Sequence, residues 1–281
     1  MKKLSPETEQ CYHKLKEYLA TFESAAVSYS GGVDSSLLLY VASIIPNLKL
    51  IAYTVKTEII PDEEIEFAIS IGKKFNVNHY ILNEDILASD EVRENSAQRC
   101  YYCKKIILSR IISAASEHNI KTVFEGSHFE DTMDYRPGLK AIEELHVLSP
   151  LKETGFNKSK IYELSSHLQL PTSNKESSPC LATRIPYRTH ITVDLLKKSE
   201  EAEKILSSLG FKKVRARIHD DILRIEVDPE MIHDITVPSI REKIYEEISK
   251  IGFSYITLDL KGYRTGSMNI DLITPPPAAA G

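Results

Sequence analysis

The sequence lacks the signals of a membrane-spanning or secreted protein. No apolar run approaches the ~20 residues that a transmembrane helix needs. The N-terminus, MKKLSPETEQ, has neither the apolar core nor the cleavage site of a secretory signal peptide. We therefore expect a cytoplasmic protein with no membrane partner.

The sequence also lacks an excess of basic residues. Its 35 Lys and Arg against 40 Asp and Glu give a formal net charge of −5. Because nucleic-acid binding depends on many Lys and Arg contacts with phosphates, this balance argues against a nucleic-acid partner. Apolar residues at 42% and charged residues at 27% lie near globular averages, which excludes a disordered or fibrous chain.

The length of 281 residues fits about two domains. From residue 25 to about 165, apolar strand patterns alternate with helical patterns, as in a parallel sheet covered on both faces. After residue 185 the pattern changes to helices around a short hairpin and a last strand. We predict an α/β domain over residues 1–185 and a smaller α+β domain over 186–274, with 275–281 set aside as a tail or remnant.

The spacing of apolar residues places the individual elements. Strands are predicted over 25–29, 50–55, 78–82, 122–126, 147–148, 214–218, 222–227 and 254–260. Helices are predicted over 35–45, 61–75, 103–118, 157–168, 193–209 and 240–251.

A loop rich in serine and glycine, SYSGGVDSS over residues 28–36, follows the first predicted strand and opens a helix. Paired glycines allow close approach of a ligand, and the N–H groups at a helix start suit an anion. The loop contains neither Gly-Lys-Ser/Thr nor G-x-G-x-x-G, so it is not a Walker-type or dinucleotide loop. A simple capped turn would leave the serines and the aspartate unexplained. We predict a phosphate site made by Ser28, Ser30, Gly31, Gly32, Asp34, Ser35 and Ser36.

Three of the four cysteines stand out. Cys100 and Cys103 form a C-x-x-C motif at the start of a predicted helix, and Cys180 follows in the segment SPCLATR. A lone C-x-x-C suits a redox dithiol, half a zinc site or part of an iron–sulfur site. Three thiolates can hold three irons of a [4Fe–4S] cluster and leave one iron open to sulfide, although three unconnected cysteines remain the alternative. We expect Cys11 to be structural.

The glycine loop resembles the S-G-G-x-D-S loop of the N-type ATP pyrophosphatases, or PP-loop enzymes. This resemblance implies a PP-loop domain that binds ATP. A substrate oxygen then attacks the α-phosphate and pyrophosphate leaves. It also implies that Asp34 helps to hold Mg²⁺.

Five later motifs resemble the LarE family of ATP-dependent sulfur insertases, which help to make the nickel-pincer nucleotide of lactate racemase. These motifs are CYYCKK from residue 100, DYRPG from 134, SPC with RIPY from 178, VRAR from 214 and GYRTG from 262. The resemblance covers residues 10 to about 272. It implies that both carboxylates of pyridinium-3,5-biscarboxylic acid mononucleotide are adenylated and then converted to thiocarboxylates.

The cysteines separate two branches of that family. One branch uses a single cysteine at the position of Cys180 as a sacrificial sulfur donor. The present sequence resembles the other branch, in which a [4Fe–4S] cluster on Cys100, Cys103 and Cys180 delivers sulfide from a separate sulfur donor. Relatives also tend to form homo-oligomers, for which the small second domain is expected to supply contacts.

Two arginines are candidate substrate ligands. Arg215 and Arg217 alternate on one predicted strand and so point to the same face, which suits a phosphate or two carboxylates. On pattern alone a solvated strand face is the better explanation of these two arginines. The family resemblance favours substrate binding, with catalytic roles for Cys180, Asp34 and both arginines.

The remaining candidates surround the expected nucleotide. Gly126 ends the fourth predicted strand, and Arg136 follows it in the motif DYRPG, at the carboxyl end of the sheet where ligands bind. A simple Pro-Gly turn is the alternative for DYRPG. Tyr53 and Thr54 are placed at the end of the neighbouring strand. Three acidic residues match family positions linked to metal binding: Glu203, Glu226 and Asp234.

Three other functions stay open. A PP-loop tRNA thiolase also pairs this loop with three cysteines and a cluster, but would need a basic surface. An ammonia-using ligase of the NAD- or GMP-synthetase type explains the loop and leaves the three cysteines idle. A nucleotide sensor would bind ATP without releasing pyrophosphate.

Overall fold

The computed structural model describes residues 3–130, 137–176, 178–264 and 266–269. The chain divides into two compact units, which we call the first unit (1–86 and 100–178) and the second unit (87–99 and 179–281). Within the described residues no helix is long and apolar enough to cross a membrane.

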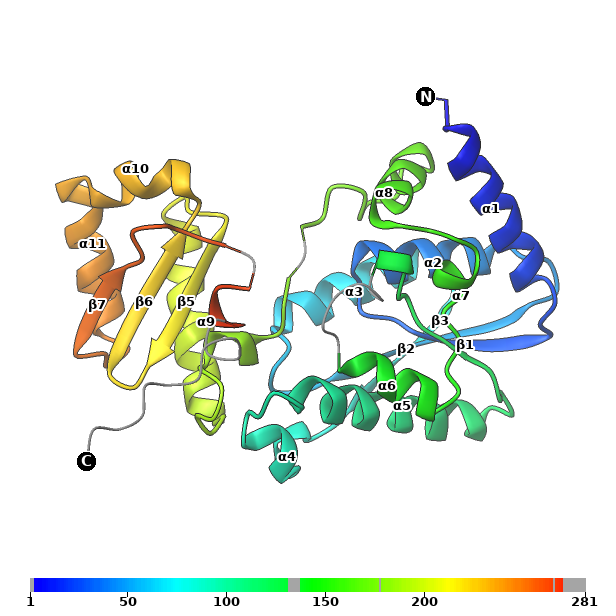
Figure 1. The fold of residues 1–281 in the computed structure, drawn as a ribbon, viewed down its shortest axis with the longest axis horizontal. Helices are drawn as coiled ribbons and strands as arrows, with labels where there is room; N and C mark the ends of the chain where they lie inside the picture. The colour runs from blue at the N-terminus through cyan, green and yellow to red at the C-terminus, as the bar shows by residue number, and fades with distance from the viewer. Residues whose placement is uncertain (1–2, 131–136, 177, 265, 270–281) are drawn as a thin grey trace. The chain divides into compact units, whose positions relative to one another are not determined.

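The first unit is built on four parallel strands in the order β3-β2-β1-β4 (Figure 1). In chain order they are β1 (Ser24–Ser28), β2 (Lys49–Lys56), β3 (Asn78–Asn83) and β4 (Val123–Phe124). Where a fifth strand is predicted over 147–148, Leu148 makes a single parallel bridge with Phe124.

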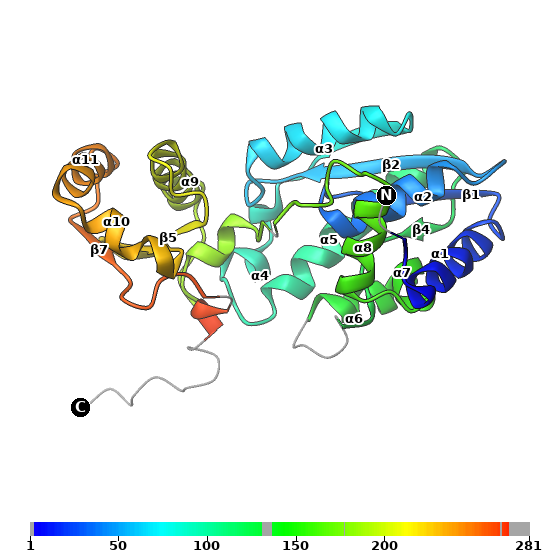
Figure 2. The same ribbon diagram turned by 90° about the horizontal axis from the view of Figure 1, so that it is seen from above.

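Helices cover both faces of this sheet (Figures 1 and 2). One apolar cluster joins the sheet to α1 (Pro6–Leu19), α2 (Val33–Ser43), α3 (Asp62–Lys74), α7 (Pro150–Glu153) and α8 (Lys158–His167). A second cluster joins the opposite face to α5 (Arg99–Glu117) and α6 (Gly138–Glu144).

The sequence of β1 shows why two layers of helices are needed. Ala25 and Val27 pack into the cluster that contains α2, whereas Ala26 packs into the cluster that contains α5. Successive side chains of a strand point to opposite faces, so a strand buried on both sides is continuously apolar. Helix α2 is buried on most of its surface because α1 and α8 pack on it.

The second unit carries a three-stranded sheet in the order β5-β6-β7. The predicted hairpin is confirmed: β5 (Val214–His219) and β6 (Ile222–Val227) pair antiparallel, and β7 (Tyr255–Leu258) adds in parallel. Asp220 sits in the turn with φ of 55°. The other elements of this unit are α4 (Asp90–Arg93), η3 (Leu181–Arg184), α9 (Val193–Ser208), η4 (Pro229–Met231), α10 (Ile232–Thr236), α11 (Pro238–Ser249) and η5 (Ser267–Asn269), with η1 (Ile86–Ala88) at the border. The α/β fold with a smaller α+β part is therefore confirmed.

The chain passes between the units after residues 86, 99 and 178. The domain boundary at residue 185 stays a prediction. Residues 87–99 join the second unit through the backbone and side chain of Asn95. The side-chain nitrogen of Asn95 donates to the backbone carbonyls of Ile185 and Pro186 at 3.3 and 2.8 Å. The backbone carbonyl of Asn95 accepts from the backbone nitrogen of Arg188 at 3.1 Å. No local pattern in the sequence signals this long-range pairing.

Candidate functional site

The candidate site of the first unit lies at the carboxyl ends of β1 and β4. These strands are neighbours, with Ala26 paired to Val123, although about a hundred residues separate them along the chain. From β1 the sheet runs toward β2 on one side and to β4 on the other, so the strand order reverses at this point. Open α/β sheets bind ligands at such a reversal, outside the carboxyl ends of the strands.

The serine–glycine loop occupies this position and begins α2. Gly32 is the residue before the helix, and no side chain in the described structure caps the helix start. Ser30 and Ser35 lie across the loop with their hydroxyl oxygens 3.1 Å apart. The uncapped N–H groups of α2 and these hydroxyls together offer hydrogen-bond donors to an anion.

Gly31 is required for the shape of this loop. Its φ is 73°, and a Cβ placed on it would lie 2.8 Å from Cβ of Ala68 on α3. We expect Gly31→Ala to lower the free energy of unfolding of the first unit by more than the ~1–2 kcal/mol of left-handed strain alone. Gly155→Ala is the matched control, because Gly155 has φ of 79° but its nearest atom would be 3.8 Å away. Urea unfolding followed by circular dichroism compares them, and equal losses would contradict the steric argument.

Asp34 is paired with a lysine that the sequence did not single out. Nζ of Lys158 lies 2.8 Å from both carboxylate oxygens of Asp34, and both side chains are partly exposed. Lys158 stands in the first turn of α8, where a positive charge opposes the helix dipole. This unfavourable placement was a signal in the sequence for a lysine held there by another partner.

A second lysine closes on the loop from the segment after α8. Nζ of Lys175 lies 2.7 Å from Glu64 Oε2, 3.4 Å from the carbonyl of Gly31 and 3.7 Å from the ring centre of Phe67. Two lysines thus lie at the loop, which suits the charge of a polyphosphate.

The residues after β4 approach the start of α2. A Cβ on Gly126 would lie 3.0 Å from the backbone nitrogen of Ser35, so any other residue would force the start of α2 to shift by a few tenths of an ångström. Glu125 is buried and accepts hydrogen bonds from Ser127 and Ser149, with Lys104 at 3.1 Å. Burial raises the pKa of this carboxyl, but Lys104 and the hydroxyls outweigh burial and hold the pKa below its usual value.

Tyr53 and Thr54 occupy the interior of β2 rather than its end. The Tyr53 hydroxyl donates to the carbonyl of Ala114 at 3.1 Å, and the Thr54 hydroxyl donates to the carbonyl of Tyr29 at 2.5 Å. Both side chains are buried. At the end of the strand stands Thr57, whose buried hydroxyl has no hydrogen-bond partner among the described residues. Thr57 is the better candidate for a ligand contact on β2.

Of the other predicted residues, Arg136 lies outside the described residues. Ser28 ends β1, and the Ser36 hydroxyl lies 3.4 Å from the hydroxyl of Tyr29. Burial, opposed by that contact, raises the pKa of Tyr29 to about 12, so this phenol stays protonated.

The C-x-x-C cysteines stand in the first two turns of α5. Cys100 and Cys103 are three residues apart, which places both on one helix face. Cys100 is exposed and Cys103 half-buried in the first unit, and Cys180 is half-buried in the second. In the described part of the chain, no three His, Cys, Asp or Glu residues gather as a metal site. Cys11, expected to be structural, is buried.

The two candidate arginines have different surroundings. Arg217 is buried, with Nε and Nη2 at 3.2 and 3.0 Å from Glu226 Oε2 and Nη1 at 2.8 Å from the carbonyl of Thr183. Arg215 is half-buried over the ring of Tyr263 at 5.0 Å and makes no ion pair with a described carboxylate. Burial and the nearby Arg184 lower the pKa of Arg215. Arg215 is therefore the arginine with capacity left for an anionic ligand.

The three acidic residues predicted as metal ligands, Glu203, Glu226 and Asp234, do not form a metal site among the described residues. Glu203 binds Arg184, and Glu226 is fully buried between Arg217, Arg224 and the hydroxyl of Ser267. Asp234 stands in the first turn of α10. The two glutamates therefore neutralise arginines in the structure.

Glu226 gives a stability prediction. Replacement of Glu226 by alanine leaves Arg217 and Arg224 without their shared carboxylate. We expect this to lower the free energy of unfolding of the second unit by about 3–5 kcal/mol, as for a broken buried ion pair. Native-state hydrogen exchange of the β5 and β6 amides measures the loss. Glu246→Ala, on the exposed side of α11, is the control and should change the free energy of unfolding by less than about 0.5 kcal/mol. Equal protection of these amides in both variants would show that the ion pairs of Glu226 with Arg217 and Arg224 add nothing to stability.

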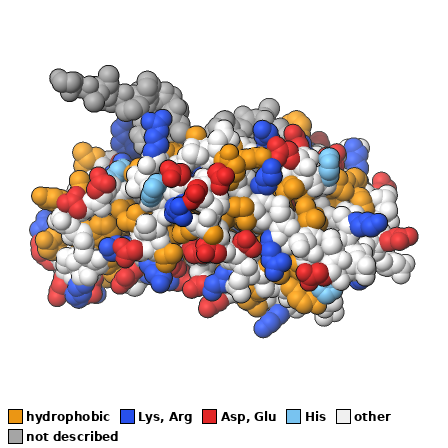
Figure 3. Space-filling model, turned by 90° about the horizontal axis from the view of Figure 1, so that it is seen from below, with side chains coloured by type: hydrophobic (Ala, Val, Ile, Leu, Met, Phe, Trp, Pro, Cys, Tyr) orange, Lys and Arg blue, Asp and Glu red, His pale blue; other side chains and the backbone are white. Residues whose placement is uncertain are grey.

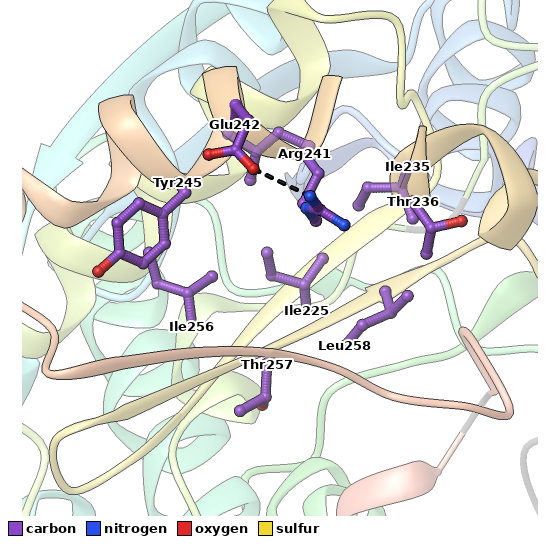
Figure 4. A pocket seen from close by; sticks show the side chains of 10 residues that line it. Ile225, Ile235, Thr236, Arg241, Glu242, Tyr245, Ile256, Thr257 and Leu258 are labelled. Carbon is purple, nitrogen blue, oxygen red and sulfur yellow. Dashed lines mark hydrogen bonds and ion pairs between the residues drawn. The ribbon is translucent and has the colours of Figure 1, made fainter. Parts of the chain in front are cut away.

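An apolar pocket also lies in the second unit, between the sheet and the helices α10 and α11 (Figure 4). Its aliphatic lining comes from Ile225, Ile235, Ile244, Ile256 and Leu258. Arg241 and Glu242 form an ion pair there at 3.0 Å. The lining contains no cysteine or histidine among the described residues, so it offers no group for sulfur transfer.

Comparison with known proteins gives the family. No family model matches the chain. The chain is 36% identical over 252 residues to the pyridinium-3,5-bisthiocarboxylic acid mononucleotide synthase of Lactiplantibacillus plantarum, covering 89% of this chain and 91% of the relative. An uncharacterised protein of Synechocystis is 32% identical, over 93% of this chain and 97% of the relative. One of Methanocaldococcus jannaschii is 30% identical, over 85% and 90%.

Among solved structures, the NMN synthetase of Francisella tularensis matches with a TM-score of 0.49 and 17% identity, over 63% of this chain and 76% of that one. The sequence relatives cover nearly the whole chain and carry the assignment. The chain belongs to the family of the pyridinium-3,5-bisthiocarboxylic acid mononucleotide synthases, the LarE family.

Proposed function

We propose that this protein is an ATP-dependent sulfurtransferase. It adenylates the carboxylates of pyridinium-3,5-biscarboxylic acid mononucleotide and converts them to thiocarboxylates. The observation that carries the proposal is the uncapped start of α2 at the strand reversal, with Lys158 and Lys175 beside it, in a chain of this family. A carboxylate needs such activation, because its carbon is electron-rich and oxide is a poor leaving group.

In the first half-reaction a substrate carboxylate oxygen attacks the α-phosphorus of ATP and pyrophosphate leaves. Asp34 would help to hold Mg²⁺, which would neutralise charge on the phosphates, and Lys158 would then be released from Asp34 to contact phosphate oxygens. Positive charge fixed beside the leaving pyrophosphate stabilises the transition state more than the ground state. Ser30, Ser35 and the α2 N–H groups donate to the same phosphates.

In the second half-reaction sulfur replaces AMP on the activated carboxyl. Cys100, Cys103 and Cys180 fit an iron–sulfur cluster by donor chemistry, since all three are thiols with some exposure. The three thiolates would hold a [4Fe–4S] cluster, and such a cluster would supply sulfide for the exchange. Arg215 binds the phosphate or a carboxylate of the substrate through its planar donors.

A small anionic substrate also fits the surface charge. On the face drawn in Figure 3, lysine and arginine side chains are interspersed with acidic ones rather than gathered into a basic patch. A tRNA substrate would require a continuous basic surface.

The test is a product assay by mass spectrometry under anaerobic conditions. Reconstituted enzyme, MgATP, sulfide and the biscarboxylate nucleotide are mixed. We expect release of AMP and pyrophosphate and two successive exchanges of oxygen for sulfur in the nucleotide. Pyrophosphate release without any sulfur in the product would reject the sulfurtransferase. An amide in place of a thiocarboxylate, when ammonia is supplied, would indicate the ligase.

A further inference from the structure

The turn that carries Cys180 is held by a buried arginine whose donors are all directed inward. Arg184, at the end of η3, is 2% exposed. Its Nε and Nη2 lie 2.8 and 2.9 Å from the two carboxylate oxygens of Glu203 on α9. This is a bidentate pair, the geometry in which arginine most firmly fixes a direction.

The remaining nitrogen of Arg184 reaches back to the cysteine turn. Nη1 lies 2.8 Å from the carbonyl of Pro179, 3.1 Å from the carbonyl of Cys180 and 2.9 Å from the hydroxyl of Thr183. The Cys180 carbonyl also accepts from the Thr183 hydroxyl and backbone nitrogen at 2.9 and 3.0 Å. One guanidinium therefore fixes the residue before the cysteine and the carbonyl of the cysteine itself.

Glu203 and Arg217 tie this arrangement to the sheet. Oε1 of Glu203 accepts from the backbone nitrogen of Ala216 on β5 at 3.0 Å, in addition to Arg184. Arg217, also on β5, donates to the carbonyl of Thr183 at 2.8 Å. Two buried arginines thus connect the backbone around Cys180 to α9 and β5 by hydrogen bonds. The backbone of an ordinary surface loop would instead bond mainly to water.

We propose that Arg184 and Glu203 are positioning residues for sulfur transfer: they fix the backbone from which the Cys180 thiol projects. This inference rests on the proposed function for its consequence in catalysis, but not for its structural content. A stability role alone would not require the guanidinium to bind three groups of the cysteine turn, at residues 179, 180 and 183. A displacement of a reacting group by about 1 Å costs about 100-fold in rate.

The test uses the full-length enzyme and two variants. Arg184→Lys keeps the charge but cannot bind Glu203 and the turn together, and Glu203→Gln keeps the shape but loses the ion pair. The first readout is alkylation of the cluster-free enzyme by iodoacetamide, with each cysteine followed by peptide mass spectrometry. In both variants we expect the alkylation rate of Cys180 to differ from that in the wild-type enzyme, while the alkylation rate of Cys100 stays unchanged.

The second readout separates the two half-reactions. Pyrophosphate release should persist in both variants, whereas thiocarboxylate formation should fall about 100-fold. Lys198→Met breaks the exposed Lys198–Asp194 pair on the same helix, 2.9 Å long, and should change neither readout. If Arg184→Lys fails to fold, the alkylation and transfer measurements on Glu203→Gln alone test the proposal.

A Glu203→Gln enzyme with unchanged alkylation at Cys180 and unchanged transfer would overturn the inference. If wild-type enzyme released no pyrophosphate, the proposed function would fail, yet the alkylation readout would still test the positioning of Cys180.

Discussion

Replacement of Cys180 by alanine is expected to abolish thiocarboxylate formation, with a loss of more than about 1000-fold, the scale seen when an essential reacting group is removed. The variant lacks a thiolate on which the proposed sulfur delivery depends. The serine–glycine loop belongs to the first unit and Cys180 to the second, so one equivalent of pyrophosphate should still be released per enzyme. A rapid-quench assay of pyrophosphate alongside mass analysis of the nucleotide measures both.

The matched control is Cys11→Ala. Cys11 is also a cysteine, but it is buried in the first unit beside the carbonyl of Gly155 at 3.5 Å. Its replacement should leave sulfur transfer unchanged apart from a small loss of stability. Iron content after anaerobic reconstitution adds a second measurement, since loss of iron in Cys180→Ala but not in Cys11→Ala supports a ligand role. Sulfur transfer that survives in Cys180→Ala would rule out any role of this thiol.

Replacement of Lys158 by alanine should slow pyrophosphate release by about 100-fold, the effect of removing one positioned charge from a developing anion. Lys158 is paired with both oxygens of Asp34, so its ammonium lies beside the residue proposed to hold Mg²⁺. The loss should appear mainly in kcat, because the charge acts most strongly on the leaving pyrophosphate. Steady-state kinetics with varied MgATP gives kcat and KM separately.

Lys160→Ala is the control for this experiment. Lys160 is two residues further along α8, but its Nζ lies 3.0 Å from the carbonyl of Gly155 and 3.5 Å from Sγ of Cys11. It therefore has the same charge on the same helix with different partners. Lys160→Ala should retain pyrophosphate release, whereas comparable losses in both variants would mean that the general positive potential of α8, rather than Lys158 itself, matters.

The strands and the main helices were predictable because their signals are local. The apolar run of β1 and the short hairpin strands β5 and β6 are read from neighbouring residues. The helix after the C-x-x-C motif was predicted from residue 103, and the structure begins α5 four residues earlier, at Arg99, so that Cys100 also lies in the helix. The serine–glycine loop was noticed because its residue types are consecutive.

The site residues that were missed depend on contacts between distant segments. Lys158 lies 124 positions from Asp34, and Lys175 lies 111 positions from Glu64. Tyr53 and Thr54 were misplaced because the strand continues to Lys56, which brings Thr57 to its end. The different surroundings of Arg215 and Arg217 could not be read from their alternation, since Glu226 on β6 and Ser267 bind Arg217 alone of the two.

The course of the chain through its two units limits how the protein can be dissected. The chain enters the second unit at residue 87, returns to the first at 100 and enters the second again at 179. A fragment that begins at residue 179 would lose the carbonyls of Arg93 and Asn95 that accept from Ile191 and Arg188. Gene fusions that transplant the second unit between family members should therefore exchange both segments, 87–99 together with the C-terminal part.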